Sequence, residues 1–303
     1  MVVLGGANID VVASADPLRP GISNRGIVRI GSGGAGRNVA ANLARLGVRT
    51  AFIGAVGDDP LSDGVVASTA QAGVDISGVT RVARSKNIYV AMIAAGLVQW
   101  AVADMTAAES LTPGHIRAHA SAIRAEDAVV IDANLTPQAI AAACELAAGR
   151  TLCLLPVSPA KASRMKPHLE AASCVVLGAA ELQVLAGSAI DDPSDAARAA
   201  GTLRRAPGLT TVVTMGARGL VWVGRDVVHI PVPPVSVRNP SGAGDAVAAA
   251  ALYGMLAGFA EDLAARLALA AGVMTVTVDD STHPDLSLKT LQAHAHAQLA
   301  IDR

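Results

Sequence analysis

Residues 237–247 read VRNPSGAGDAV, a glycine turn that leads directly into the alanine-rich stretch beginning at Ala246. Consecutive small residues allow backbone N–H groups to converge, and a helix that starts here adds about half a positive charge at its N-terminus. The pattern therefore predicts a backbone cradle for an anion, and phosphate is the anion that such cradles commonly bind.

Asp245 lies inside this predicted cradle, where its negative charge opposes the anion that the backbone attracts. A role as proton acceptor beside a transferring phosphoryl group explains why a carboxylate lies in an anion-binding turn. The structural alternative is helix capping, for which aspartate is also favoured. We predict a kinase in which Asp245 is the catalytic base and the backbone of Gly242, Ala243, Gly244 and Asp245 forms the anion hole.

A second glycine cluster, GSGGAG at residues 31–36, also precedes a helical stretch, but the polar residue that follows it is Asn38. A neutral amide can bind hydroxyl groups without charge repulsion. Asn8 and Asp10 follow the apolar run 1–4, at the carboxyl end of a predicted strand, where α/β sheets bind ligands. Since a carboxylate can accept hydrogen bonds from two neighbouring hydroxyls, we expect these three side chains to hold a polyol.

The composition is that of an ordered globular protein, with 52% hydrophobic and 16% charged residues among 303. A net charge of −1 gives no basic footprint for nucleic acid or for an anionic membrane. The three cysteines have spacings typical of neither zinc sites nor redox pairs, and no basic region of a signal peptide opens the sequence. We therefore expect a cytoplasmic protein with a small-molecule substrate and no nucleic-acid or membrane partner.

Apolar runs and alanine-rich helical segments alternate along most of the chain. Repeated β-α units of this kind favour a parallel sheet covered by helices on both faces. We expect the last helix before the glycine turn at 241–244 to begin at Ser194, with Asp195 in its first turn. The expected strands are 1–4, 50–53, 128–131, 151–155, 174–177 and 211–214, and the expected helices are 37–46, 60–72, 136–148, 194–205, 246–258 and 262–273.

Two stretches, 11–30 and 79–104, interrupt this alternation with short β-prone pieces, and Gly96 is the expected turn in the second. We expect both to contribute strands to a small sheet that covers the carboxyl ends of the main strands as a lid. Tyr89 in the second stretch either packs the lid strands or stacks on a nucleobase. Residues 1–303 are thus expected to form a single α/β domain with a lid.

Two motifs resemble the signatures of a known family. Residues 33–47, GGAGRNVAANLARLG, resemble the first signature of ribokinase-like (phosphofructokinase-B type) carbohydrate and nucleoside kinases, and residues 241–245, SGAGD, resemble the second. The order and the separation of the two motifs match as well. The resemblance implies a three-layer α/β/α fold with a mainly parallel sheet, the use of ATP and Mg²⁺, and a homodimer that forms through the lid.

Shorter matches make the chain resemble the pseudouridine kinases within this family. The resemblance implies that Asp245 takes a proton from the 5′-hydroxyl of a nucleoside, most closely pseudouridine, to give the 5′-monophosphate. These matches are PGISN at 20–24, ADM at 103–105, DANL at 132–135, PVS at 156–158 and THPDLS at 282–287.

The resemblance also assigns residues to the ligands. Glu181 corresponds to the acidic member of a motif that organises magnesium through water. Ser23 and Asn24 either contact the nucleobase or form a turn. The residues that correspond to the ribose site are Asp10, Gly34, Asn38 and Asn134, with Gly33 in the same glycine turn. The residues that correspond to the ATP site are Thr214, Gly216, Gly219, Gly242 and Gly244.

The chain departs from the family pattern at several positions, including Ala35, where ribokinases have a lysine, and Val247, where phenylalanine is frequent. Gly178 stands where the magnesium motif usually has asparagine, and Asn239 replaces a common aspartate, which leaves activation by a monovalent cation open. Lys161 and Arg164 are expected to be solvated. The alternatives are another nucleoside or sugar kinase of this fold, similar to ribokinase or to adenosine or cytidine kinase, and a catalytically silent ligand-binding relative. A Rossmann dehydrogenase is disfavoured because residues 5–10 lack the G-x-G-x-x-G spacing.

Overall fold

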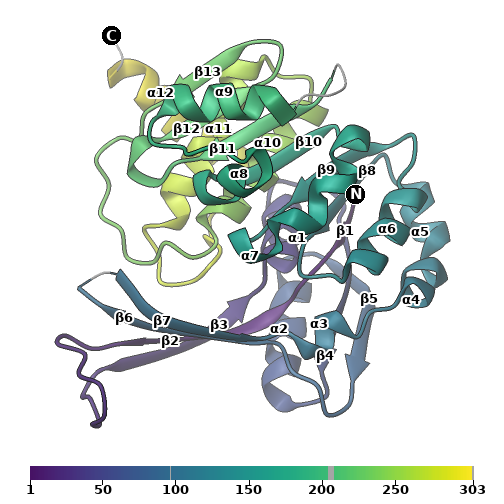
Figure 1. The fold of residues 1–303 in the computed structure, drawn as a ribbon, viewed down its shortest axis with the longest axis vertical. Helices are drawn as coiled ribbons and strands as arrows, with labels where there is room; N and C mark the ends of the chain where they lie inside the picture. The colour runs from purple at the N-terminus through teal and green to yellow at the C-terminus, as the bar shows by residue number, and fades with distance from the viewer. Residues whose placement is uncertain (96, 204–207, 302–303) are drawn as a thin grey trace.

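The computed structural model describes residues 1–95, 97–203 and 208–301, and its main feature is a large sheet (Figure 1). The strands of this sheet are β1 (Val2–Leu4), β4 (Ala51–Gly57), β5 (Asp75–Val82), β8 (Ala128–Asp132), β9 (Thr151–Leu155), β10 (Cys174–Gly178), β11 (Thr210–Thr214), β12 (Leu220–Val223) and β13 (Val227–Ile230). Their order is β13-β12-β11-β10-β9-β8-β1-β4-β5. All neighbours from β5 to β11 pair in parallel, while β12 and β13 add antiparallel strands at one edge. The mainly parallel α/β sheet predicted from the sequence is confirmed.

Helices cover both faces of the large sheet. One layer contains α1 (Ala35–Arg45), α2 (Pro60–Gln71), α10 (Ala243–Leu256), α11 (Glu261–Thr275) and α12 (Leu288–Ile301). The other contains α3 (Thr106–Glu109), α4 (Pro113–Ala118), α5 (Ala120–Ala125), α6 (Pro137–Leu146), α7 (Pro159–Ala162), the 3₁₀ helix η1 (Ser163–Ala171), α8 (Ala179–Ala186) and α9 (Pro193–Leu203). A short 3₁₀ turn, η2 (Gly216–Arg218), follows β11. Along β1, Val3 packs into the first layer and its neighbours Val2 and Leu4 into the second, which explains why the strands are continuous apolar runs.

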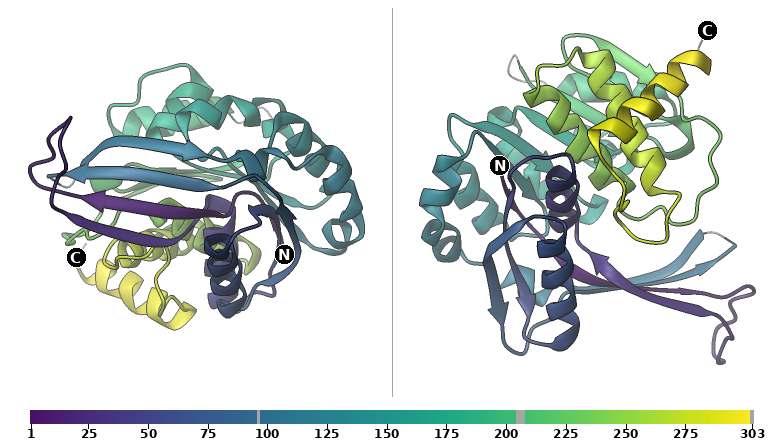
Figure 2. Two further views of the ribbon diagram at one scale, coloured as in Figure 1. Left: turned by 90° about the horizontal axis from the view of Figure 1, so that it is seen from below. Right: turned by 180° about the vertical axis from the view of Figure 1, so that it is seen from behind.

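A second, smaller sheet projects from the body below the large one (Figures 1 and 2). It consists of β2 (Asn8–Ser14), β3 (Ile27–Gly33), β6 (Ile88–Ala94) and β7 (Leu97–Asp104), in the order β3-β2-β6-β7. Its two outer pairs are antiparallel and the central pair β2–β6 is parallel. Residues 79–82, expected in this sheet, lie instead in β5, because that strand pairs with β4 of the large sheet. Gly96 lies outside the described residues.

Asn87 joins the two sheets. Its side-chain nitrogen donates to the carbonyls of Ala7 and Ala55, at 2.9 and 2.7 Å, and its side-chain oxygen accepts from the Ala108 amide at 3.0 Å. The residue is 2% exposed, so all three hydrogen bonds form away from water. This buried amide fixes the point at which β2 and β6 leave the body.

The N-terminal cap of α9 differs from the prediction. The helix begins at Pro193, which suits the first helical position because it needs no N–H there. Asp192 Oδ1 accepts from the Asp195 amide at 2.8 Å, so the capping side chain is Asp192 and not Ser194. The expected end of this helix at residue 205 lies outside the described residues. None of the described helices has both the length and the apolar character that a membrane crossing requires.

Candidate active site

The glycine turn at 242 begins helix α10 as the sequence predicts. Gly242 adopts φ 77° and is the N-cap, and its carbonyl accepts from the Ala246 amide at 2.9 Å. The first N–H groups of a helix have no partner within the helix. Among the described hydrogen bonds none engages the amides of Ala243, Gly244 or Asp245. These amides are therefore available to an anionic ligand.

Asp245 lies in the first turn of α10 and contacts α1. Asn38 Nδ2 donates to Asp245 Oδ2 at 2.8 Å, and Asn38 is only 3% exposed. Desolvation raises the pKa of Asp245 to about 7, against the opposing effect of the Asn38 hydrogen bond, and the charges of Asp132 and Asp10 raise it further. The carboxylate still lines a cavity. A carboxyl group with this pKa can accept a proton near neutral pH, as a general base must.

Asp10 and its neighbours form a polar surface where the small sheet leaves the body. Asn8 Nδ2 donates to Asp10 Oδ1 at 2.6 Å, and Tyr89 of β6 is the register partner of Asp10. Burial raises the pKa of Asp10 and that of Tyr89, and the Asp10 charge adds to the effect on Tyr89. A Cβ at Gly33 would lie 2.2 Å from Asp10 Oδ2, so only glycine leaves room for this carboxylate. The structure thus brings together Asn8, Asp10, Gly33 and Tyr89.

Asp132 is an organising residue to which sequence reasoning gave no role. It is 0% exposed, and its carboxylate accepts from the amides of Gly6, Gly36 and Asn134 at 2.9, 2.7 and 2.8 Å. Burial raises its pKa, and these backbone hydrogen bonds oppose the rise. Its partners lie up to 126 residues away, so the only local signal is an aspartate at the end of an apolar strand. One buried carboxylate therefore holds both N-terminal glycine loops to β8.

Lys161 and Arg164, expected to be solvated, are in fact bound at the site. Lys161 Nζ donates to the side-chain oxygen of Asn134 at 2.6 Å, and Asn134 Nδ2 donates to Asp132 at 3.1 Å. Arg164 donates to the carbonyls of residues 133 and 135. The prediction failed because α7 and η1 fold back over the end of β8, a tertiary contact that helical periodicity does not reveal. The polar atoms of Asn134 are thus engaged by protein groups.

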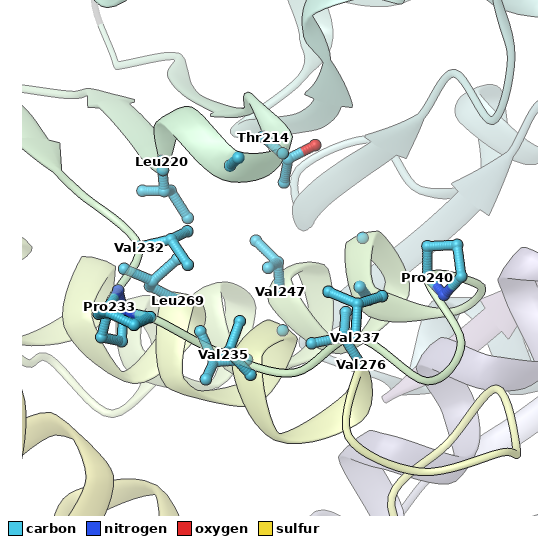
Figure 3. A pocket seen from close by; sticks show the side chains of 18 residues that line it. Thr214, Leu220, Val232, Pro233, Val235, Val237, Pro240, Val247, Leu269 and Val276 are labelled. Atoms are coloured by element: carbon cyan, nitrogen blue, oxygen red, sulfur yellow. The ribbon is translucent and has the colours of Figure 1, made fainter. Parts of the chain in front are cut away.

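An apolar cavity of about 570 Å³ lies against the start of α10, where Ala243, Gly244 and Val247 line it (Figure 3). Thr214, Gly216, Gly219 and Gly244, which the resemblance assigns to ATP, line it, while Gly242 does not. Most of the remaining wall is aliphatic, and Figure 3 shows these side chains around the opening: Leu220, Val232, Val235, Val237, Val247, Leu269 and Val276. A cavity of this size and character suits a flat heterocyclic ring such as a nucleobase.

A smaller cavity of about 80 Å³ shares the lining residues Thr214 and Gly244 with the apolar cavity, and Asp245, Gly178 and Glu181 also line it. A Cβ at Gly178 would lie 2.5 Å from Glu181 Oε2, so the Glu181 carboxylate occupies the space above the glycine. No group of three metal-ligating side chains occurs among the described residues. Mg²⁺ commonly takes one carboxylate, water and substrate phosphate oxygens. The donor set of this cavity therefore fits a magnesium ion that a nucleotide would mainly hold, and Glu181 would be its protein ligand or water partner.

Ser23 and Asn24 lie in the loop between β2 and β3, at the outer end of the small sheet (Figure 2). Asn24 Oδ1 accepts from the Arg19 amide at 2.8 Å, and Asn24 Nδ2 donates to the carbonyls of Arg19 and Ile22. Ser23 is exposed. The Asn24 side chain therefore closes its own turn, which is the second of the two interpretations left open by the sequence.

The fold and the site together define an ATP-dependent kinase of sugars or nucleosides. The chain belongs to the pfkB family of carbohydrate kinases, whose sequence pattern matches residues 1–287. It is 28% identical to the pseudouridine kinase of Escherichia coli K12, over 95% of this chain and 94% of that protein. It is 27% identical to the guanosine-inosine kinase of Exiguobacterium acetylicum, over 83% and 86%.

Solved structures of kinases share the fold. A carbohydrate kinase from Agrobacterium tumefaciens has 32% sequence identity and a TM-score of 0.80, with 97% of this chain and 96% of that chain covered. A ribokinase from Arabidopsis thaliana, complexed with ribose and ATP, has 20% identity and a TM-score of 0.80, with 97% of each chain covered. At that identity the second likeness concerns the fold alone.

Proposed function

We propose that this kinase transfers the γ-phosphoryl group of ATP to the 5′-hydroxyl of a nucleoside, with pseudouridine as the substrate. The observation that carries the proposal is the position of Asp245, whose carboxylate lies beside free helix N-terminal amides and close enough to Asp10 for the Asp10 charge to raise its pKa. The identity to a pseudouridine kinase over almost the whole chain supports the substrate.

In the proposed reaction Asp10 and Asn8 hold the sugar hydroxyls, and the 5′-oxygen points at Asp245. Asp245 accepts the 5′-hydroxyl proton as the oxygen forms its bond to the γ-phosphorus and the bond from that phosphorus to the bridging oxygen of ADP breaks. The amides of Ala243, Gly244 and Asp245 stabilise the charge on the transferring group. Asn38 keeps the carboxylate oriented throughout. A bound magnesium ion would neutralise charge on the phosphates of ATP.

The substrate proposal is tested by measuring kcat/KM for pseudouridine, uridine, inosine, ribose and fructose side by side. We expect pseudouridine to be preferred over uridine, as the resemblance implies. Since the two differ only in how the base is attached, this comparison isolates recognition of the base. A preference for inosine or for a free sugar would show that pseudouridine is not the substrate, while the assignment as a kinase would stand. If no acceptor stimulates ATP consumption, the protein is instead a silent ligand-binding relative.

Asn239 joins two loops beside the glycine turn. Its Nδ2 donates to the Asp279 carbonyl at 2.7 Å, and its Oδ1 accepts from the Ser241 amide at 2.9 Å. A neutral amide that already bridges these groups leaves no need for a cation to do so. We therefore expect kcat to be the same in potassium chloride and in tetramethylammonium chloride. Strong activation by potassium would show that a cation completes the turn despite Asn239.

The small sheet exposes several large apolar side chains, among them Val28, Ile30, Trp100 and Val102, which are 52–69% exposed. Their exposure on a projecting sheet supports the homodimer through the lid that the resemblance implies.

A further inference from the structure

A third cavity, of about 440 Å³, lies between α1, the end of α2 and the loop 279–284. It shares no lining residue with the two cavities of the active site. Three charged side chains line it: Arg37, Arg45 and Asp280. Its uncharged polar lining residues are Ser32, Ser68, Gln71 and Thr282.

The two arginines bring positive charge to this cavity, and no described ion pair holds either of them, although the charges of Asp10, Asp245 and Asp280 act on Arg37 from a distance. Arg37 is 4% exposed, and four of its hydrogen bonds are described: to Thr69 Oγ1, Asn38 Oδ1, the Ser32 carbonyl and Ser68 Oγ. None of these acceptors is charged, and a guanidinium has five N–H donors, so one donor of Arg37 remains.

Arg45 is less well satisfied than Arg37. Its Nη1 is buried and has no hydrogen-bond partner among the described residues. Burial lowers the pKa of Arg37 to about 10, and the charge of Arg45 contributes to that shift. A buried guanidinium next to a half-buried one, neither in a described ion pair, is costly in free energy, and a ligand anion would lower that cost.

Among the described residues that line this cavity, Asp280 is the one carboxylate, and it counts against a purely anionic ligand. It is exposed, and no described ion pair involves it. Its charge acts on both arginines, but the cavity still carries two cations and one anion. The ligand that complements this arrangement has a phosphate for the arginines and hydroxyl groups for the carboxylate.

We propose that this cavity binds a small sugar phosphate or nucleoside monophosphate, with its phosphate on Arg37 and Arg45 and its hydroxyls on Asp280. Guanidinium groups match the geometry of phosphate oxygens, and the cavity has room for a sugar beyond the phosphate. Ser68, Gln71 and Thr282 supply further neutral donors.

The cavity is connected to the catalytic base by two hydrogen bonds. Arg37 Nη1 donates to Asn38 Oδ1 at 3.0 Å, and Asn38 Nδ2 donates to Asp245 Oδ2 at 2.8 Å. A ligand that fixes Arg37 therefore fixes the amide that orients Asp245. The ligand thus regulates the transfer reaction, and this part of the inference rests on the proposed kinase function.

Calorimetric titration with ribose 5-phosphate tests the binding, since this compound lacks the free 5′-hydroxyl of a substrate. We expect Arg45→Ala to weaken its binding by about tenfold or more, because a charge-assisted hydrogen bond is lost. Arg49→Ala is the matched control, since the Arg49 side chain is 90% exposed, and its binding should equal that of the wild type. Inorganic phosphate should show the same dependence on Arg45 with lower affinity, whereas equal affinity would identify free phosphate as the ligand.

Equal binding of ribose 5-phosphate by the wild type and Arg45→Ala overturns the proposal. Arg45→Met, which keeps an unbranched apolar chain, and thermal unfolding of both variants control for folding. If neither variant folds, a crystal of the wild type soaked in ribose 5-phosphate decides: density for its phosphate at Arg45 supports the site, and an empty cavity refutes it.

The regulatory part is read from initial rates of ATP consumption with and without ribose 5-phosphate. We expect a severalfold change in kcat for the wild type and none for Arg45→Ala, whose rate without the ligand should be normal. If ribose 5-phosphate binds without changing the rate, the proposed regulation is wrong and the proposed binding site stands. Absence of kinase activity in every variant would instead refute the proposed function, which the titration does not require.

Discussion

Asp245→Asn is expected to lower kcat by roughly 10²–10⁴-fold while leaving the dissociation constant of the nucleoside nearly unchanged. The asparagine keeps the size of the side chain and can still accept the hydrogen bond from Asn38, but it cannot take the proton. Steady-state kinetics and equilibrium binding measure the two effects separately. Near-normal turnover would contradict the role of Asp245 as base.

The same substitution is expected to stabilise the protein above neutral pH. The pKa of Asp245 rises from 3.8 to about 7 on folding, so between these values the folded state binds more protons than the unfolded state. The free energy of unfolding of the wild type therefore falls as pH rises from about 4 to about 7, by at most roughly 4 kcal/mol. In Asp245→Asn the free energy of unfolding should not fall in this way, because asparagine does not titrate. Chemical denaturation of both proteins at pH 5 and pH 8 measures the difference.

The control for this variant is Asp58→Asn. Asp58 is exposed, so the substitution removes a charge without touching the site, and the stability and rate of Asp58→Asn should follow those of the wild type at both pH values.

The kcat/KM of the wild type should rise with pH up to about 7, because only the ionised Asp245 accepts a proton. A rate independent of pH through this range would mean that another group limits the reaction.

Gly242→Ala is expected to have the second large effect, on both stability and rate. Gly242 has φ 77°, and a Cβ there would lie 1.8 Å from the Ser281 carbonyl oxygen. The backbone conformation costs about 1 kcal/mol and the forced movement of the loop roughly 1–3 kcal/mol more. Since the turn positions the amides of the anion hole, displacement by about 1 Å should also lower kcat by roughly 10²-fold.

Gly258→Ala is the matched control for backbone strain. Gly258 has φ 71° and no atom within 4 Å of the added Cβ, so it shows the conformational cost without the collision. We expect a loss of about 1 kcal/mol and an unchanged kcat. The measurements are the free energy of unfolding and the kcat of both variants. If Gly242→Ala behaves like Gly258→Ala, the collision with Ser281 has no effect and the explanation is wrong.

The sequence predicted those parts of the site whose cause is local. The glycine turn before α10, the carboxylate of Asp245 beside that turn, and the polar residues that follow β1 all depend on a few consecutive residues, although α10 begins at Ala243 and not at the expected residue 246. The large-sheet strands were also predictable, because a strand buried on both faces is a continuous apolar run. The antiparallel pair β12–β13 and the membership of residues 79–82 in β5 were not, because pairing partners are set by neighbouring strands.

What the sequence alone determined is therefore the chemistry: an amide cradle with one carboxylate, a second glycine loop and a mainly parallel α/β sheet. Only the tertiary structure decided how that chemistry is held, since Asn38 meets Asp245 across 207 residues and Asp132 ties Gly6 to β8 across 126. The raised pKa of Asp245 and the paired guanidiniums of Arg37 and Arg45 have the same origin. Desolvation and charge proximity depend on which elements pack together, and a linear sequence does not contain that information locally.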